Sequence, residues 1–326
     1  MLSPADRSKA AQILLAAEKE RKPAVQLSKT FPDITIEDAY AIQSEVTRIK
    51  VAEGHRVRGH KVGLTSKAMQ QSSQIDEPDY GHLMDYMFIA DGAKIPFERF
   101  IVPRVEIELA FVLGKPLKGP GVELVDVLRA TEYVVPAIEI IDARVQNPRK
   151  IFDTVSDNGA AAGIVMGGRP VGPMEVDLRW VSGLLSRNSE IEETGVAAGV
   201  LGHPAMGIAW LANKVGSFGT TLEPGHVVLA GSFTRPVWAA KGDTLRADFG
   251  PLGSISVQFV GASARSARAG LAPVLKQSRN KAAHALGVRG IVREQSAQTA
   301  LFQHRFCQQH RSQRDPAGNF PQVAVG

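Results

Sequence analysis

The chain has 326 residues, of which 44% are hydrophobic and 22% charged, a composition typical of a globular protein with a sizeable core. Its net charge of +5 is uneven, because residues 261–326 hold 10 basic and 2 acidic residues whereas residues 1–260 hold 28 basic and 31 acidic ones. No apolar run is long enough to cross a bilayer, and no signal peptide is recognisable. The single cysteine, Cys307, excludes an intramolecular disulfide and a thiolate metal cluster. We therefore expect a cytoplasmic protein without a membrane or nucleic-acid partner.

The first part of the chain is predicted to be helical. Residues 3–22 carry a weak apolar stripe, and a turn follows at Phe31-Pro32-Asp33. Thr35 and Asp38 then resemble a capping box that opens a second helix, which ends before Gly54. We expect residues 1–57 to form a small helical N-terminal region that serves as scaffold or subunit contact.

A short strand is predicted at residues 58–65, and a polar loop at residues 66–80. Lys61 lies on the strand, where a solvated lysine is the ordinary alternative to a functional one. Asp79 belongs to the turn-like string Glu77-Pro78-Asp79-Tyr80-Gly81, and a turn-forming aspartate is the alternative there.

An acidic pair stands in the apolar, β-prone segment 104–113. Strand side chains alternate between faces, so Glu106 and Glu108 point the same way. Two such carboxylates repel each other and lose hydration, and a divalent cation with oxygen ligands removes both penalties. The alternative is an edge strand whose acidic face is simply hydrated.

A third carboxylate, Glu139, interrupts the next apolar strand, predicted at residues 133–142. Three carboxylates on two strands would make an oxygen-rich cation site that leaves coordination positions for a substrate. This is a hypothesis from the pattern of residues.

The remaining elements are predicted to be mostly strands. The predicted strands are residues 160–168, 178–187, 227–230 and 254–260, with a helix at residues 204–215. Gly231 and Ser232 follow a strand and offer donors to a substrate oxyanion, or form an ordinary turn. We find no glycine motif of the dinucleotide-binding type. Residues 58–260 are expected to form the catalytic domain, and residues 261–326 a basic, disordered tail.

Several motifs together resemble the hydratase/decarboxylase branch of the fumarylacetoacetate hydrolase superfamily. The likeness spans about residues 10–260. Two features depart from it: the tail has no counterpart in the family, and the segment between Arg144 and Lys150 is shorter than in this branch. The motifs are Gly59 to Ser66, Glu77 to Gly81, Arg104 to Glu108, Glu139 to Arg144, Ile191 to Val200 and Gly231 to Thr234.

The resemblance implies an α+β fold, with a mixed β-roll or barrel-like core. It implies that Glu106, Glu108 and Glu139 bind Mg2+ or Mn2+, that Lys61 and Asp79 are catalytic, and that Lys150 and Ser232 contact the substrate. Beside a cation, Lys61 is expected to have a lowered pKa and to act as a base near neutral pH.

The implied activity is that of a hydro-lyase in aromatic catabolism. We expect water to add to the small dicarboxylate 2-oxo-hept-4-ene-1,7-dioate, an intermediate of the homoprotocatechuate meta-cleavage pathway. Decarboxylation of 4-oxalocrotonate and hydration of 2-hydroxypenta-2,4-dienoate are the alternatives, and a non-catalytic partner subunit is the alternative from another class. The resemblance also implies a homo-oligomer, with a pathway decarboxylase as an associated partner.

Overall fold

The computed structural model describes residues 1–66, 70–71 and 77–261. The tail predicted to be disordered lies outside these residues from 262 onward, as do residues 67–69 and 72–76 of the predicted loop. None of the helices in the described part of the chain combines the length and the hydrophobicity that a membrane span requires.

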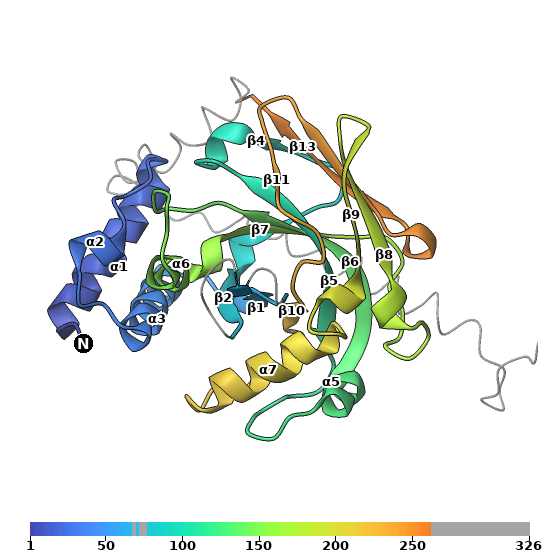
Figure 1. The fold of residues 1–326 in the computed structure, drawn as a ribbon, viewed down its shortest axis with the longest axis horizontal. Helices are drawn as coiled ribbons and strands as arrows, with labels where there is room; N and C mark the ends of the chain where they lie inside the picture. The colour runs from blue at the N-terminus through green and yellow to red at the C-terminus, as the bar shows by residue number, and fades with distance from the viewer. Residues whose placement is uncertain (67–69, 72–76, 262–326) are drawn as a thin grey trace, which may run out of the picture. The chain divides into compact units, whose positions relative to one another are not determined.

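Two mixed sheets form the framework (Figure 1). The larger sheet has eight strands, of which seven follow the order β2-β1-β10-β5-β6-β7-β3 and β11 pairs with β5. Its strands are β1 (Val57–Gly63), β2 (Asp79–Met84), β3 (Phe88–Ile89), β5 (Arg104–Leu113), β6 (Thr131–Ile141), β7 (Ala161–Met166), β10 (Val227–Leu229) and β11 (Val237–Trp238). The smaller sheet, in the order β4-β13-β12-β8-β9, consists of β4 (Ala93–Pro96), β8 (Ser182–Arg187), β9 (Glu190–Val196), β12 (Thr244–Asp248) and β13 (Ser254–Val260).

Helices lie beside the two sheets (Figure 1). They are α1 (Pro4–Glu20), α2 (Leu27–Thr30), α3 (Ile36–Ala52), α5 (Leu124–Ala130), α6 (Ile151–Ser156) and α7 (Ala205–Gly216). Parallel pairing occurs between β1 and β10, β3 and β7, and β4 and β13, while the other strand pairs are antiparallel. The predicted α+β class with a mixed, barrel-like core is thus confirmed.

The N-terminal helices support the strand that carries Asp79. The predicted capping box is present, since Thr35 accepts from the N–H of Asp38 and the carboxylate of Asp38 accepts from the N–H of Thr35. On the same helix, the buried Gln43 side chain donates to the carbonyls of Tyr80 in β2 and Val155 in α6. These two hydrogen bonds join α3 to both β2 and α6. The domain boundary at residue 57 stays a prediction.

Strands β5 and β6 run side by side through the larger sheet, and β5 lies between β6 and β10 (Figure 1). Ile107, Leu109 and Phe111 are completely buried in the main hydrophobic core on one face of β5. The alternate residues, Glu106 and Glu108 among them, point to the other face. Burial of these apolar side chains stabilises β5, although the strand also carries two acidic residues.

Two predicted elements differ in the structure. Residues 178–180 of the predicted strand form a short 3-10 turn, because the Asp177 carboxylate accepts from the N–H of Arg179, and the strand begins only at Ser182. Asp79 is not in a turn: it opens strand β2 and pairs with Gly63 of β1.

Candidate metal and catalytic site

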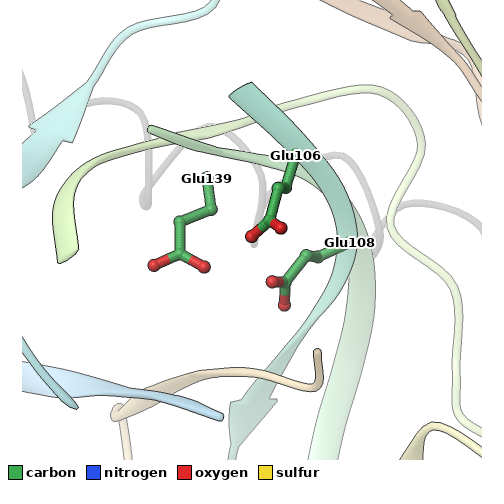
Figure 2. A group of neighbouring side chains, drawn as sticks. All are labelled: Glu106, Glu108 and Glu139. Carbon is green, nitrogen blue, oxygen red and sulfur yellow. The ribbon is translucent and has the colours of Figure 1, made fainter. Parts of the chain in front are cut away.

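Three glutamate carboxylates converge on one point of the larger sheet (Figure 2). Glu106 and Glu108 share a face of β5, and the antiparallel register places Glu139 of β6 directly opposite Glu106. One carboxylate oxygen from each residue lies within 4.8 Å of the other two. The predicted acidic cluster is therefore formed by strand pairing, not by a loop.

Glu108 and Glu139 are buried, and Glu106 is half-buried. Glu108 is 1% exposed and Glu139 is fully buried, which rules out the alternative of a hydrated edge strand. Burial, and then the charge of Glu139, raise the pKa of Glu106 to about 7. Burial and the neighbouring carboxylates raise the pKa of Glu108 well above its ordinary value, and burial raises the pKa of Glu139 despite the opposing charge of Lys61. The protein alone therefore disfavours full ionisation of this cluster.

A divalent cation fits these residues. Both carboxylate oxygens of Glu139 are buried and have no hydrogen-bond partner among the described residues. Buried charged oxygens without partners are costly unless a cation binds them. Carboxylate oxygens are the ligands that Mg2+, Mn2+ and Ca2+ prefer, and the donor set holds no softer atom that would favour copper or zinc.

Lys61 and Asp79 lie next to this cluster. The Lys61 ammonium is 3.8 Å from a carboxylate oxygen of Glu139, and both Lys61 and Asp79 are buried. An atom placed as a Cβ on Gly63 would lie 3.0 Å from Nζ of Lys61 and 2.2 Å from Oδ1 of Asp79. Both side chains thus border the space above Gly63 without forming an ion pair with each other, and Oδ1 of Asp79 has no hydrogen-bond partner in the described part of the chain.

The charge state of Lys61 in the absence of a cation follows from its neighbours. Burial by itself lowers the pKa of Lys61, but the carboxylates of Glu139, Asp79, Glu106 and Glu108 outweigh it and raise the pKa above its ordinary value. The lowered pKa predicted beside a cation concerns the cation-bound site and stays a prediction. Within the described residues alone, the ammonium form is the stable one because four carboxylates surround it.

Gly63 has a role in the site that the sequence analysis did not assign. It lies two residues after Lys61, and this spacing puts both residues on the same face of β1. Any side chain there would occupy the space in which Lys61 and Asp79 meet. The periodicity of the strand is the signal that could have identified it.

We expect Gly63→Ala to lower kcat by about a hundredfold, because a displacement of about 1 Å between reacting groups costs that much. Binding of Mg2+ should persist, since Gly63 contributes no ligand. The measurement is steady-state turnover together with Mg2+ titration. Gly199→Ala is the matched control, because the nearest atom to a Cβ at Gly199 is 3.7 Å away. Full activity of Gly63→Ala would contradict this arrangement.

The Gly231–Thr234 segment supports the cluster. The N–H of Gly231 donates to a carboxylate oxygen of Glu108 at 2.8 Å, so it is engaged and does not offer a free donor to an oxyanion. Gly231 has a φ of +119°, and a Cβ there would lie 2.2 Å from the hydroxyl oxygen of Thr65. Ser232 is half-buried beside the site, and its hydroxyl donates to the carbonyl of Thr234 in a local turn.

Lys150 is not brought into the cluster. It is exposed at the start of α6, where its backbone N–H donates to the carboxylate of Asp153. No hydrogen bond or ion pair among the described residues joins its ammonium group to Glu106, Glu108 or Glu139. Its predicted contact with a substrate stays a prediction.

Comparisons with known proteins agree on one family. Residues 51–260 match the family model described as fumarylacetoacetate (FAA) hydrolase C-terminal. The chain is 61% identical over 257 residues to the 2-oxo-hept-4-ene-1,7-dioate hydratase of Escherichia coli, an alignment that covers 77% of this chain and 96% of that protein. It is 39% identical over 259 residues to the 2-keto-4-pentenoate hydratase of Paraburkholderia xenovorans, with 79% of this chain and 96% of that protein covered.

A solved structure is also similar. The 4-oxalocrotonate decarboxylase from Pseudomonas putida G7, complexed with magnesium and adipate, superposes with a TM-score of 0.78 at 35% sequence identity. The superposition covers 80% of this chain and 99% of that one.

Proposed function

We propose that this chain, which belongs to the fumarylacetoacetate hydrolase family, adds water to 2-oxo-hept-4-ene-1,7-dioate to give 4-hydroxy-2-oxoheptanedioate. The chain is an enzyme of the hydro-lyase class, as its close relatives are named hydratases. The observation that carries the proposal is the burial of three carboxylates beside Lys61 and Asp79, in a chain 61% identical to a hydratase of this substrate.

The three glutamates are the residues that would hold a divalent cation. When bound, this cation would supply positive charge that stabilises the negative charge developing on the C2 oxygen of the substrate. The N–H of Gly231 would hold the Glu108 carboxylate in place for that purpose. Glu106 is the least buried of the three.

Lys61 and Asp79 would carry the proton transfers. The protonated Nζ of Lys61 would donate a proton to C5, and the enol proton that leaves the C2 oxygen would return Nζ to its ammonium form. Oδ1 of Asp79, buried and without a described partner, would then accept a proton from the water whose oxygen bonds to C4 and would pass that proton to C3. The net result is the addition of one water molecule.

Decarboxylation of 4-oxalocrotonate is the second candidate, because the decarboxylase fold superposes closely on this chain and a relative of that name is 36% identical over 245 residues. Hydration of 2-hydroxypenta-2,4-dienoate is a further alternative, which requires no cationic contact for a second carboxylate. A non-catalytic subunit is disfavoured, because the acidic cluster, Lys61 and Asp79 are all present in one buried site.

The finer parts of the proposal concern the setting of the reaction. We propose Mg2+ or Mn2+ as the cation, which the all-carboxylate donor set supports. We place the reaction in the homoprotocatechuate meta-cleavage pathway of 4-hydroxyphenylacetate degradation, a placement supported by the relative at 61% identity, a 2-oxo-hept-4-ene-1,7-dioate hydratase. We also propose a cytoplasmic location. A homo-oligomer associated with a pathway decarboxylase is also part of this proposal.

The test is anaerobic turnover of 2-hydroxy-hepta-2,4-diene-1,7-dioate with and without Mg2+, with the product identified by mass. The expected result is Mg2+-dependent gain of one water molecule. Loss of CO2 from 4-oxalocrotonate, without hydration of the heptadiene-dioate, would move the assignment to the decarboxylase. Turnover of neither compound by protein shown to bind Mg2+ would overturn both.

A further inference from the structure

Arg104 opens the strand that carries the acidic pair. It stands two residues before Glu106 on the same face of β5, opposite Ile141 of β6. Two strand residues span about 6.6 Å, so a long side chain at position 104 lies beside the end of the acidic cluster. The alternation of half-buried and buried residues from Arg104 to Ile107 confirms that Arg104 and Glu106 face the same side.

The Arg104 guanidinium is held in place but is not neutralised. It lies over the Trp238 ring, 5.1 Å from the ring centroid, and no hydrogen bond or ion pair of its side chain occurs within the described residues. Stacking on an aromatic face restrains a guanidinium while its N–H groups at the edge remain available. Such a group is prepared to bind a carboxylate through two parallel hydrogen bonds.

A second guanidinium nearby also has no anionic partner. Arg149 lies in the loop between β6 and α6, and its Nη1 atom is buried without a hydrogen-bond partner in the described part of the chain. Burial lowers the pKa of Arg149, the charges of Asp157 and Asp153 oppose this, and the positive charges of Arg104 and Arg144 lower the pKa further. A buried donor without an acceptor, beside a like charge, is unfavourable unless an anion binds there.

The carboxylates close to Arg149 are already engaged. Asp157 accepts from the backbone N–H and the guanidinium of Arg144. Asp153 accepts from the N–H and hydroxyl of Ser28 and from the N–H of Lys150. Among the described residues, neither aspartate forms an ion pair with Arg149, so Arg149 and Arg104 both remain available to an incoming anion.

We propose that Arg104 and Arg149 together bind the remote carboxylate of the dicarboxylate substrate. The inference rests on the proposed function, because it assumes that the 2-oxo acid end of the substrate lies at Glu106, Glu108 and Glu139. A seven-carbon dioate bound there carries its second carboxylate along the face of β5 toward Arg104. A five-carbon monocarboxylate has no group to place between the two arginines, so this pair selects for dicarboxylates.

The experiment compares Arg104→Met and Arg149→Met with the wild type on 2-hydroxy-hepta-2,4-diene-1,7-dioate and 2-hydroxypenta-2,4-dienoate, both with Mg2+. The ratio of the two kcat/KM values, dioate over pentadienoate, is expected to fall on the order of tenfold or more in each variant, mainly through KM for the dioate. Arg58→Met is the matched control, since Arg58 is an exposed arginine of the same sheet that lies over the Phe88 ring. Its ratio should match that of the wild type.

A binding measurement separates this inference from the reaction itself. With Mg2+ present, adipate should raise the thermal midpoint of the wild type more than hexanoate does, and this difference should vanish in both variants. An unchanged kcat/KM ratio, or equal losses on both substrates, would overturn the role of the arginines. A wild type that binds adipate in preference to hexanoate but hydrates neither dienoate would instead overturn the proposed reaction and leave the arginine pair standing.

Discussion

Glu106→Gln is expected to lower Mg2+-dependent turnover by about a thousandfold or more, while the protein remains folded. An amide in place of this carboxylate removes one anionic ligand of the cation, and the charge stabilisation supplied by a cation contributes several kcal/mol to such reactions. The measurement is turnover over a range of Mg2+ concentrations. Glu132→Gln is the matched control, because Glu132 is an exposed glutamate of β6 outside the cluster.

Thermal unfolding gives Glu106→Gln a readout that does not depend on activity. Mg2+ should raise the thermal midpoint of the wild type and of Glu132→Gln, because a ligand that binds only the folded state stabilises it. It should have little effect on Glu106→Gln. Without Mg2+, the variant should be at least as stable as the wild type, since it removes one of three mutually repelling buried carboxylates. Wild-type turnover in Glu106→Gln would contradict the metal assignment.

Lys61→Met is expected to lower kcat by a factor on the order of 10² to 10⁴, the range that general acid–base catalysis contributes. The substitution removes the proton that Nζ is proposed to donate while it keeps most of the side-chain volume. Mg2+ should bind the variant at least as tightly as the wild type, because the ammonium 3.8 Å from Glu139 competes with a cation for that carboxylate.

The control for Lys61→Met is another buried lysine. Lys50 forms an ion pair with Glu18 at 2.6 Å, on α3 and α1, so Lys50→Met removes a buried lysine at a different place. It should lose stability but keep its kcat. Turnover of Lys61→Met equal to that of the wild type would remove Lys61 from the mechanism, and loss of Mg2+ binding would make its role structural.

The acidic strand could be predicted almost completely from the sequence. The predicted strand 104–113 and the observed β5 have the same bounds, because the segment combines an apolar core face with high β-propensity. The spacing of Glu106 and Glu108 predicts that both lie on one face of the strand. The capping box at Thr35 is likewise predicted from residues that are close together in the chain. Signals of this kind depend only on neighbours in the chain, so they can be found without a fold.

The environment of the catalytic residues could not be predicted in the same way. Asp79 was assigned to a turn on the local string Glu77 to Gly81, but its pairing with Gly63 makes it part of a strand. Without a cation, four carboxylates from three other strands raise the pKa of Lys61, and the sequence does not show that they surround it. Gly231 was interpreted as an oxyanion donor or a turn residue, and its N–H binds Glu108. Each of these outcomes depends on residues far away in the sequence.

By itself, the sequence determined the α+β class, the strands that carry Glu106, Glu108 and Glu139, and the family, because periodicity, capping and motif spacing are local properties of a chain. Only the tertiary structure decided the register that sets Glu139 opposite Glu106, and the meeting of Lys61 with Asp79 over Gly63. It also decided that the guanidinium groups of Arg104 and Arg149 form no ion pair within the part of the chain that the structure describes. The physical reason is that burial and electrostatic interaction act through space, between strands that pairing brings together from distant parts of the chain.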